Sequence, residues 1–150
     1  MRGWKIIVSF QPKQLSADVS VSAQILPHDV ADIKGSGFKS VIINRPDGEK
    51  PGQPMSHDLQ KLLTDHDISV RYVPMSPGEL TPELLTTMAE ALEDMPKPIL
   101  AFCASGTRST VLWCFANVNT MGVDAVLNTA MTAGYNLEQI RPILTQLSHQ

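Results

Sequence analysis

The chain has 150 residues, of which 43% are hydrophobic and 18% are charged, and its formal net charge is −3. This length fits one ordinary domain and is too short for two, so we expect a single domain over residues 1–150 with a core of its own. The weakly negative charge and the scattered basic residues argue against a nucleic-acid-binding protein.

Regular strand and helix patterns alternate along the chain. Residues 19–24 alternate apolar and polar side chains, which is typical of a half-buried strand. Thr81 followed by Pro82 is a good helix start, since it combines a hydroxyl cap with a pre-set backbone angle. In chain order, the expected elements are a strand at 19–24, a short helix from Pro27 to about Gly35, a strand at 38–43, a helix at 55–65, a strand at 68–73, a helix from Pro82 to about Asp94, a central strand at 98–102 and helices from about Thr107 onward, broken near Gly122 and Gly134.

This order predicts an α/β fold, a three-layer sandwich with a mostly parallel central sheet flanked by helices. In such sheets, ligands bind beyond the carboxyl ends of the strands. The loops at 45–47, 74–80 and 103–108 all follow strands and are expected to meet at that edge. The sequence therefore predicts a site where these three loops converge.

The first ten residues, the lengths of the apolar stretches and the two cysteines indicate a compartment. Met1 to Phe10 holds one apolar run that is too short for the core of a signal peptide. No stretch approaches the roughly 18 apolar residues that a membrane-spanning helix needs. Two cysteines are too few for a disulfide framework, so we expect a cytoplasmic protein with free thiols.

The loop after the central strand, Cys103-Ala104-Ser105-Gly106-Thr107-Arg108, carries the candidate chemistry. The N-terminus of the following helix and the N–H groups of the loop would stabilise a Cys103 thiolate. Gly106 allows the turn that points successive N–H groups inward, and Arg108 offers a planar fork to a tetrahedral anion. A cysteine that only filled the core would explain none of these neighbours.

The predicted catalytic residues are Cys103 as nucleophile, Arg108 as anion fork and Ser109, whose hydroxyl is expected to bind the sulfur. Residues 104–107, which are Ala104, Ser105, Gly106 and Thr107, are predicted to bind the anion together with Arg108. Three further residues are expected to line the site, and these are Arg45, Asp47 and Glu79. Cys114 is expected to be a buried structural thiol. The four histidines show no ligand spacing, so neither a metal nor a cofactor is expected.

A family resemblance covers residues 15–146, and it is carried by the segments Val19 to Gln24, Asn44 to Pro54, Leu80 to Pro82, Phe102 to Ser109 and Leu112-Trp113. In these segments the chain resembles the beta-lactamase hydrolase-like protein, phosphatase-like domain family. It implies a fold similar to that of dual-specificity protein tyrosine phosphatases. In some members this domain is fused to a metallo-hydrolase of sulfide oxidation and is associated with sulfur transfer. Many members have Arg where this chain has Ala104, which removes a positive charge beside the thiolate.

Two reactions fit a covalent Cys103 intermediate. The tyrosine-phosphatase loop has one more residue between Cys and Arg than the four found here, and the shorter loop is closer to that of rhodanese-type sulfurtransferases. A phosphatase also needs a general acid, and residues 74–80 contain no Asp, which leaves Glu79 or Asp47 as substitutes. The sequence thus favours a sulfurtransferase, with a phosphatase as the alternative and a non-catalytic anion-binding module as a further one. The expected partner is a small anion such as thiosulfate, a persulfide or a phosphate ester.

Overall fold

A computed structural model describes residues 10–148 of the chain. Its five strands form one sheet in the order β1-β2-β5-β3-β4, in which the two-residue edge strand β1 is antiparallel to β2 and all other neighbours are parallel. The strands are β1 (Lys13–Gln14), β2 (Val19–Ser22), β3 (Ser40–Ile43), β4 (Ser69–Tyr72) and β5 (Ile99–Phe102).

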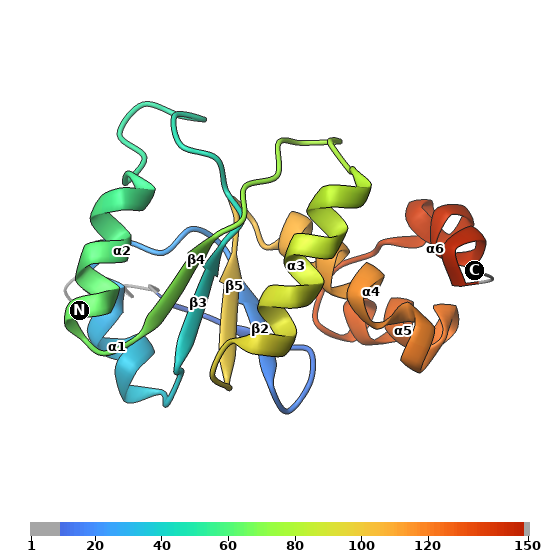
Figure 1. Ribbon diagram of the computed structural model, residues 1–150, viewed down its shortest axis with the longest axis horizontal. Helices are drawn as coiled ribbons and strands as arrows, with labels where there is room; N and C mark the ends of the chain where they lie inside the picture. The colour runs from blue at the N-terminus through green and yellow to red at the C-terminus, as the bar shows by residue number, and fades with distance from the viewer. Residues whose placement is uncertain (1–9, 149–150) are drawn as a thin grey trace, which may run out of the picture.

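Helices cover both faces of the sheet (Figure 1). Helices α1 and α2 lie on one face, and α3 to α6 lie on the other. The helices are α1 (Val30–Gly35) after a 3₁₀ turn (Pro27–Asp29), α2 (Ser56–Asp65), α3 (Pro82–Asp94), α4 (Thr107–Met121), α5 (Val123–Thr132) and α6 (Arg141–Ser148) after a second 3₁₀ turn (Glu138–Ile140). The predicted three-layer α/β fold with a mostly parallel sheet is confirmed.

The central strand β5 separates two hydrophobic cores. Leu100 and Phe102 pack with α1 and α2, whereas Ile99 and Ala101 pack with the helices of the opposite face. Successive side chains of a strand point to opposite faces, so a strand covered on both sides must be apolar throughout. All four residues of β5 are buried, and Cys103 follows them directly.

The observed bounds differ from the expected ones by up to two residues at the strand ends. The Thr81 hydroxyl accepts a hydrogen bond from Leu84 N (3.1 Å), as its predicted capping role requires. Sequence reasoning missed β1, because two exposed residues beside a proline carry no strand pattern. The segment considered as a signal peptide lies almost wholly in residues 1–9, outside the described residues. Between residues 10 and 148, no helix is long and apolar enough to cross a membrane.

Candidate active site

The sheet register places Cys103 at the carboxyl edge of the sheet between two other chain segments. Phe102, the last residue of β5, pairs with Ser22 of β2 on one side and with Ile43 of β3 on the other. Gln24 N donates to Ala104 O (3.3 Å), and Asn44 N donates to Phe102 O (2.9 Å). The segments that follow β2 and β3 thus flank the cysteine, and the one after β2 is not among the three loops that the sequence predicts to meet here.

The loop from Cys103 to Arg108 wraps around the cysteine sulfur. Cys103 is fully buried, and Gly106 N donates to Sγ at 3.1 Å. Helix α4 begins at Thr107, so its first N–H groups, which have no partner inside the helix, belong to the loop. These groups and the positive end of the helix favour an anion at this position.

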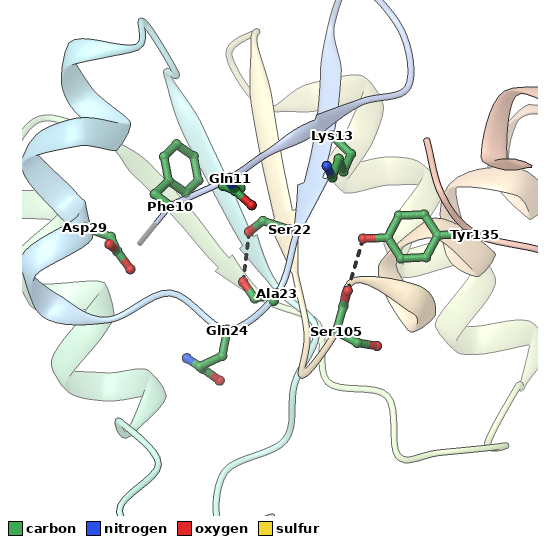
Figure 2. Close-up of a pocket in the computed structure, with 9 residues that line it drawn as sticks. All are labelled: Phe10, Gln11, Lys13, Ser22, Ala23, Gln24, Asp29, Ser105 and Tyr135. Carbon is green, nitrogen blue, oxygen red and sulfur yellow. Dashed lines mark hydrogen bonds between the residues drawn. The ribbon is translucent and has the colours of Figure 1, made fainter. Parts of the chain in front are cut away.

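Gly106 is required for both conformation and space. Its φ of 95° lies in the left-handed region that favours glycine. A side chain at this position would collide with the hydroxyl of Tyr135, and its Cβ would come within 3.2 Å of Ser22 O. Tyr135 donates from this hydroxyl to Ser105 O at 3.0 Å (Figure 2). Burial raises the pKa of Tyr135, and the charge on Cys103 raises it further, so this phenol stays protonated.

Arg108 uses one edge of its guanidinium to hold itself in place. Its Nη1 donates to Glu49 Oε2 (2.7 Å) and to Met75 O (2.7 Å), and its Nη2 donates to Glu49 Oε1 (2.9 Å). A guanidinium has five N–H groups, so one on Nη2 and the one on Nε are left over. These two lie on the same side of the group and form a second fork, of the kind that binds two oxygens of a phosphate.

Glu49 is the acid that orients this fork, and no local sequence pattern marks it as a site residue. It also accepts a hydrogen bond from Arg45 Nε at 2.9 Å, while Arg45 Nη1 donates to Gln24 Oε1 at 3.0 Å. The hydrogen bond from Arg108, supported by the one from Arg45, lowers the pKa of Glu49 to about 2. Glu49 is therefore a carboxylate at any physiological pH. The buried Arg45, expected to line the site, braces Glu49.

Ser109 has a partner other than the expected one. Its hydroxyl donates to Asn44 Oδ1 at 2.8 Å and not to the sulfur of Cys103. The amide of Asn44 is fixed because its Nδ2 donates to Val73 O at 2.8 Å, which turns Oδ1 toward Ser109. Asn44 thereby joins the ends of β3 and β4 to α4. A direct part for Ser109 in catalysis remains a prediction.

The two candidate acids differ in their surroundings. Asp47 accepts hydrogen bonds from Ser56 N (2.7 Å) and Ser56 Oγ (2.7 Å), so its carboxylate holds the first residue of α2. Glu79 is exposed in the loop between β4 and α3. Asp47 thus has a structural partner in Ser56, whereas Glu79 is exposed to solvent.

The second cysteine differs chemically from the first. Cys114 is fully buried in α4, and burial raises the pKa of its thiol to about 12. It is therefore a neutral thiol packed among apolar side chains, as expected. Within residues 10–148, no cluster of three or more His, Cys, Asp or Glu side chains is placed to hold a metal ion.

Comparison with known protein families gives one matching model. The model of the family described as "Beta-lactamase hydrolase-like protein, phosphatase-like domain" matches residues 12–120. A beta-lactamase hydrolase-like protein of Agrobacterium fabrum is 26% identical over 100 residues, which make up 67% of this chain and 23% of that protein. The matched region therefore spans about a quarter of the length of this curated relative.

Solved structures agree with this match. A protein of Neisseria meningitidis, described as a candidate phosphatase, has a TM-score of 0.80 and 29% identity, covering 89% of this chain and 95% of its own. The core catalytic domain of the PP-IP phosphatase SIW14 from S. cerevisiae has a TM-score of 0.66 and 16% identity, covering 97% of this chain and 94% of its own. At that identity the likeness to SIW14 concerns the fold alone.

These comparisons change the ranking of the two reactions. The resemblance inferred from the sequence is confirmed, and the matched family and the similar structures are phosphatase-like. None of them supports the expected preference for a sulfurtransferase, or thiosulfate and persulfides as substrates. The phosphatase alternative fits the comparisons better.

The pairing of Glu49 with Arg108 predicts that the Glu49→Gln variant is less stable than the unmodified protein, by an amount that depends on pH. Glu49→Gln should lower the free energy of unfolding by about 1.5–3 kcal/mol near pH 7, because a charge-assisted hydrogen bond is lost. The pKa of Glu49 is lowered from 4.5 to about 2, so its stabilisation is complete above pH 4.5 and declines as the pH falls toward 2. Urea unfolding of both proteins between pH 2 and pH 7 should show the difference shrinking over that window. Glu90→Gln, on the exposed side of α3, is the matched control.

The two edges of Arg108 predict that lysine cannot replace it. Arg108→Lys should lower the affinity for inorganic phosphate by about tenfold or more, because an ammonium group cannot bind Glu49 and present a second fork at the same time. Titration calorimetry with phosphate measures this loss. Full affinity in a folded Arg108→Lys protein would contradict the two-edge geometry. Lys97→Arg, at an exposed position before β5, controls for the change of cation.

Proposed function

Because the chain belongs to the beta-lactamase hydrolase-like protein, phosphatase-like domain family, we propose that it hydrolyses phosphoric monoesters through a phosphorylated Cys103. The observation that carries this proposal is that one short loop begins with a buried cysteine and ends with Arg108, one edge of which is held by Glu49. A nucleophile and a fixed planar cation at one loop suit a group with several equivalent oxygens.

In the first step, the Cys103 thiolate attacks the phosphorus atom of the ester. An S–P bond forms, the bond between phosphorus and the ester oxygen breaks, and the alcohol leaves. The N–H groups of the loop and the free edge of Arg108 bind the other three oxygens, which carry the charge of the transition state. Gly106 N, which lies 3.1 Å from Sγ, stabilises the thiolate before attack and the sulfur as it leaves later.

In the second step, water attacks the phosphorus and the S–P bond breaks. Inorganic phosphate leaves, and the thiolate of Cys103 is restored. Water loses a proton in this step, and the alcohol gains one in the first, so the full reaction consumes one water and leaves the enzyme unchanged. A covalent intermediate divides one difficult displacement into two easier ones.

The supply of a proton to the alcohol limits the range of substrates. The loop at residues 74–80 contains no Asp, and Asp47 is held by Ser56. Glu79, in the same loop, is exposed to solvent. We infer that esters of acidic alcohols, whose oxygen leaves without a proton, are the better substrates.

The expected compartment and binding partner follow from the same chemistry. A thiolate nucleophile needs a reducing compartment, and the cytoplasm remains the predicted location. We propose a small phosphate ester as the partner, bound by residues 104–108, with no cofactor.

The intermediate predicts a specific adduct. On a brief reaction with an aryl phosphate and an acid quench, mass spectrometry should find one phosphoryl group on Cys103. Cys103→Ser should remain folded, because the change is nearly isosteric, and should lose at least about a thousandfold in rate. The same experiment with thiosulfate should give no added sulfur. A sulfur adduct without a phosphoryl adduct would contradict the proposal and restore the sulfurtransferase.

The missing acid predicts a strong dependence on the leaving group. For a series of phosphate monoesters, kcat/KM should fall steeply as the pKa of the alcohol rises, and phosphoserine should be about 10²–10⁴-fold slower than an aryl ester. Steady-state kinetics across the series measures the slope.

Two variants test the remaining acids in this series. Glu79→Gln should leave the slope unchanged, and Asp47→Asn should lower thermal stability with little effect on the slope, because Asp47 holds α2. Efficient hydrolysis of phosphoserine that either variant abolishes would instead identify that residue as the general acid.

A further inference from the structure

A pocket of about 210 Å³ lies against the outside of the Cys103 loop (Figure 2). Ser105 and Tyr135 form one wall, and the end of β2 with Gln24 forms another. Phe10 and Lys13 close it from the N-terminal side. Because Ser105 belongs to both the pocket and the loop, the pocket adjoins the proposed phosphate site.

Asp29 gives the pocket its chemical character. It is only 3% exposed, and Figure 2 shows it across the pocket from Ser105 and Tyr135. Its Oδ2 accepts a hydrogen bond from Leu26 N at 2.8 Å. Its Oδ1 is buried without a hydrogen-bond partner among the described residues, and the exposed His28 approaches it only to 3.5 Å. A buried carboxylate oxygen in this condition is costly and needs a donor.

The charges of the pocket restrict what can supply that donor. Lys13, on the edge strand β1, adds a positive charge to the lining, opposite in sign to Asp29. The pocket is smaller than the roughly 300–1,000 Å³ of sites for drug-sized ligands. A small molecule with an anionic end and a donor at its other end matches both the size and the arrangement of charge.

We propose that this pocket selects small phosphomonoesters whose alcohol part carries a hydroxyl or ammonium group that donates to Asp29 Oδ1. This inference rests on the proposed phosphatase function, because it takes the loop as the phosphate site. It goes beyond that function by naming the substrate class and Asp29 as the residue that recognises it. Asp29 binds the part of the substrate that leaves and takes no part in breaking the ester bond.

A set of phosphonates tests the pocket without requiring turnover. The probes are alkylphosphonates with chains of two to five carbons, each ending in a methyl, a hydroxyl or an amino group. Titration calorimetry on the full chain should show, at one or more chain lengths, about tenfold tighter binding for a donor-bearing probe than for the methyl probe of equal length. The hydroxyl and amino arms distinguish a polyol phosphate from an amino-alcohol phosphate.

Asp29→Asn gives the sharpest comparison. Leu26 N must keep an acceptor, so the amide oxygen of Asn takes the place of Oδ2 and its NH₂ group faces the pocket. The variant should therefore lose the preference for donor-bearing probes while keeping the affinity for the methyl probes. Asp32→Asn, at an exposed position of α1, is the matched control and should keep the preference.

The outcomes separate the two proposals. Equal binding of the three probes at every chain length in the unmodified protein would overturn the role of the pocket, whatever becomes of the phosphatase. Selective binding without a phosphoryl adduct on Cys103 would overturn the proposed hydrolysis and leave the pocket as a binding site. If no phosphonate bound at any length, the loop would not be a phosphate site, and both proposals would be wrong.

Discussion

Three parallel strands, β2, β5 and β3, end at the same level, and the site depends on this shared end. The register that pairs Phe102 with Ser22 and Ile43 brings next to the cysteine two segments that lie about 80 and 60 residues before it in the chain. Backbone hydrogen bonds from Gln24 N and Asn44 N then fix the loop on both sides. Cys103 therefore directly follows a rigid, buried strand, so the position of its sulfur is fixed before any substrate binds.

The charged side chains at this edge of the sheet are held in fixed orientations. Two guanidinium groups, those of Arg45 and Arg108, share the carboxylate of Glu49. Together the three side chains keep one net positive charge beside the loop that ends at Arg108. Because the carboxylate binds the far edge of Arg108, it fixes the orientation of the cation without occupying the edge that meets the anion. A mobile arginine would lose entropy each time that it bound, and this one has lost most of it in the free protein.

The sequence predicts those structural features that depend on residues close together in the chain. The apolar run before Cys103, the Thr81 cap and the glycine breaks after α4 and α5 are local patterns, and the structure has each of them. The contacts that orient the site are not local. Glu49 lies 59 positions before Arg108, and Asn44 lies 65 before Ser109, so no periodic pattern links them. Closeness in the sequence predicts the Cys103 sulfur as the partner of Ser109, whereas the fold brings the fixed amide oxygen of Asn44 to it. The preference for sulfur transfer depends on the length of the Cys103–Arg108 loop and on an absent acid, and neither feature identifies a reaction by itself.

The hydrogen bond from Tyr135 to Ser105 also sets an order of assembly. Every other side chain that fixes the loop, from Asn44 through Glu49 to Arg108, precedes Tyr135 in the chain. During synthesis the cysteine, its arginine and the glutamate all emerge before the phenol that covers Gly106. A nascent chain ending before Gly134 already contains the nucleophile and its cation, but the wall that Tyr135 forms is still missing. The loop is therefore completed only once Tyr135 has been synthesised, and until then its outer side faces solvent.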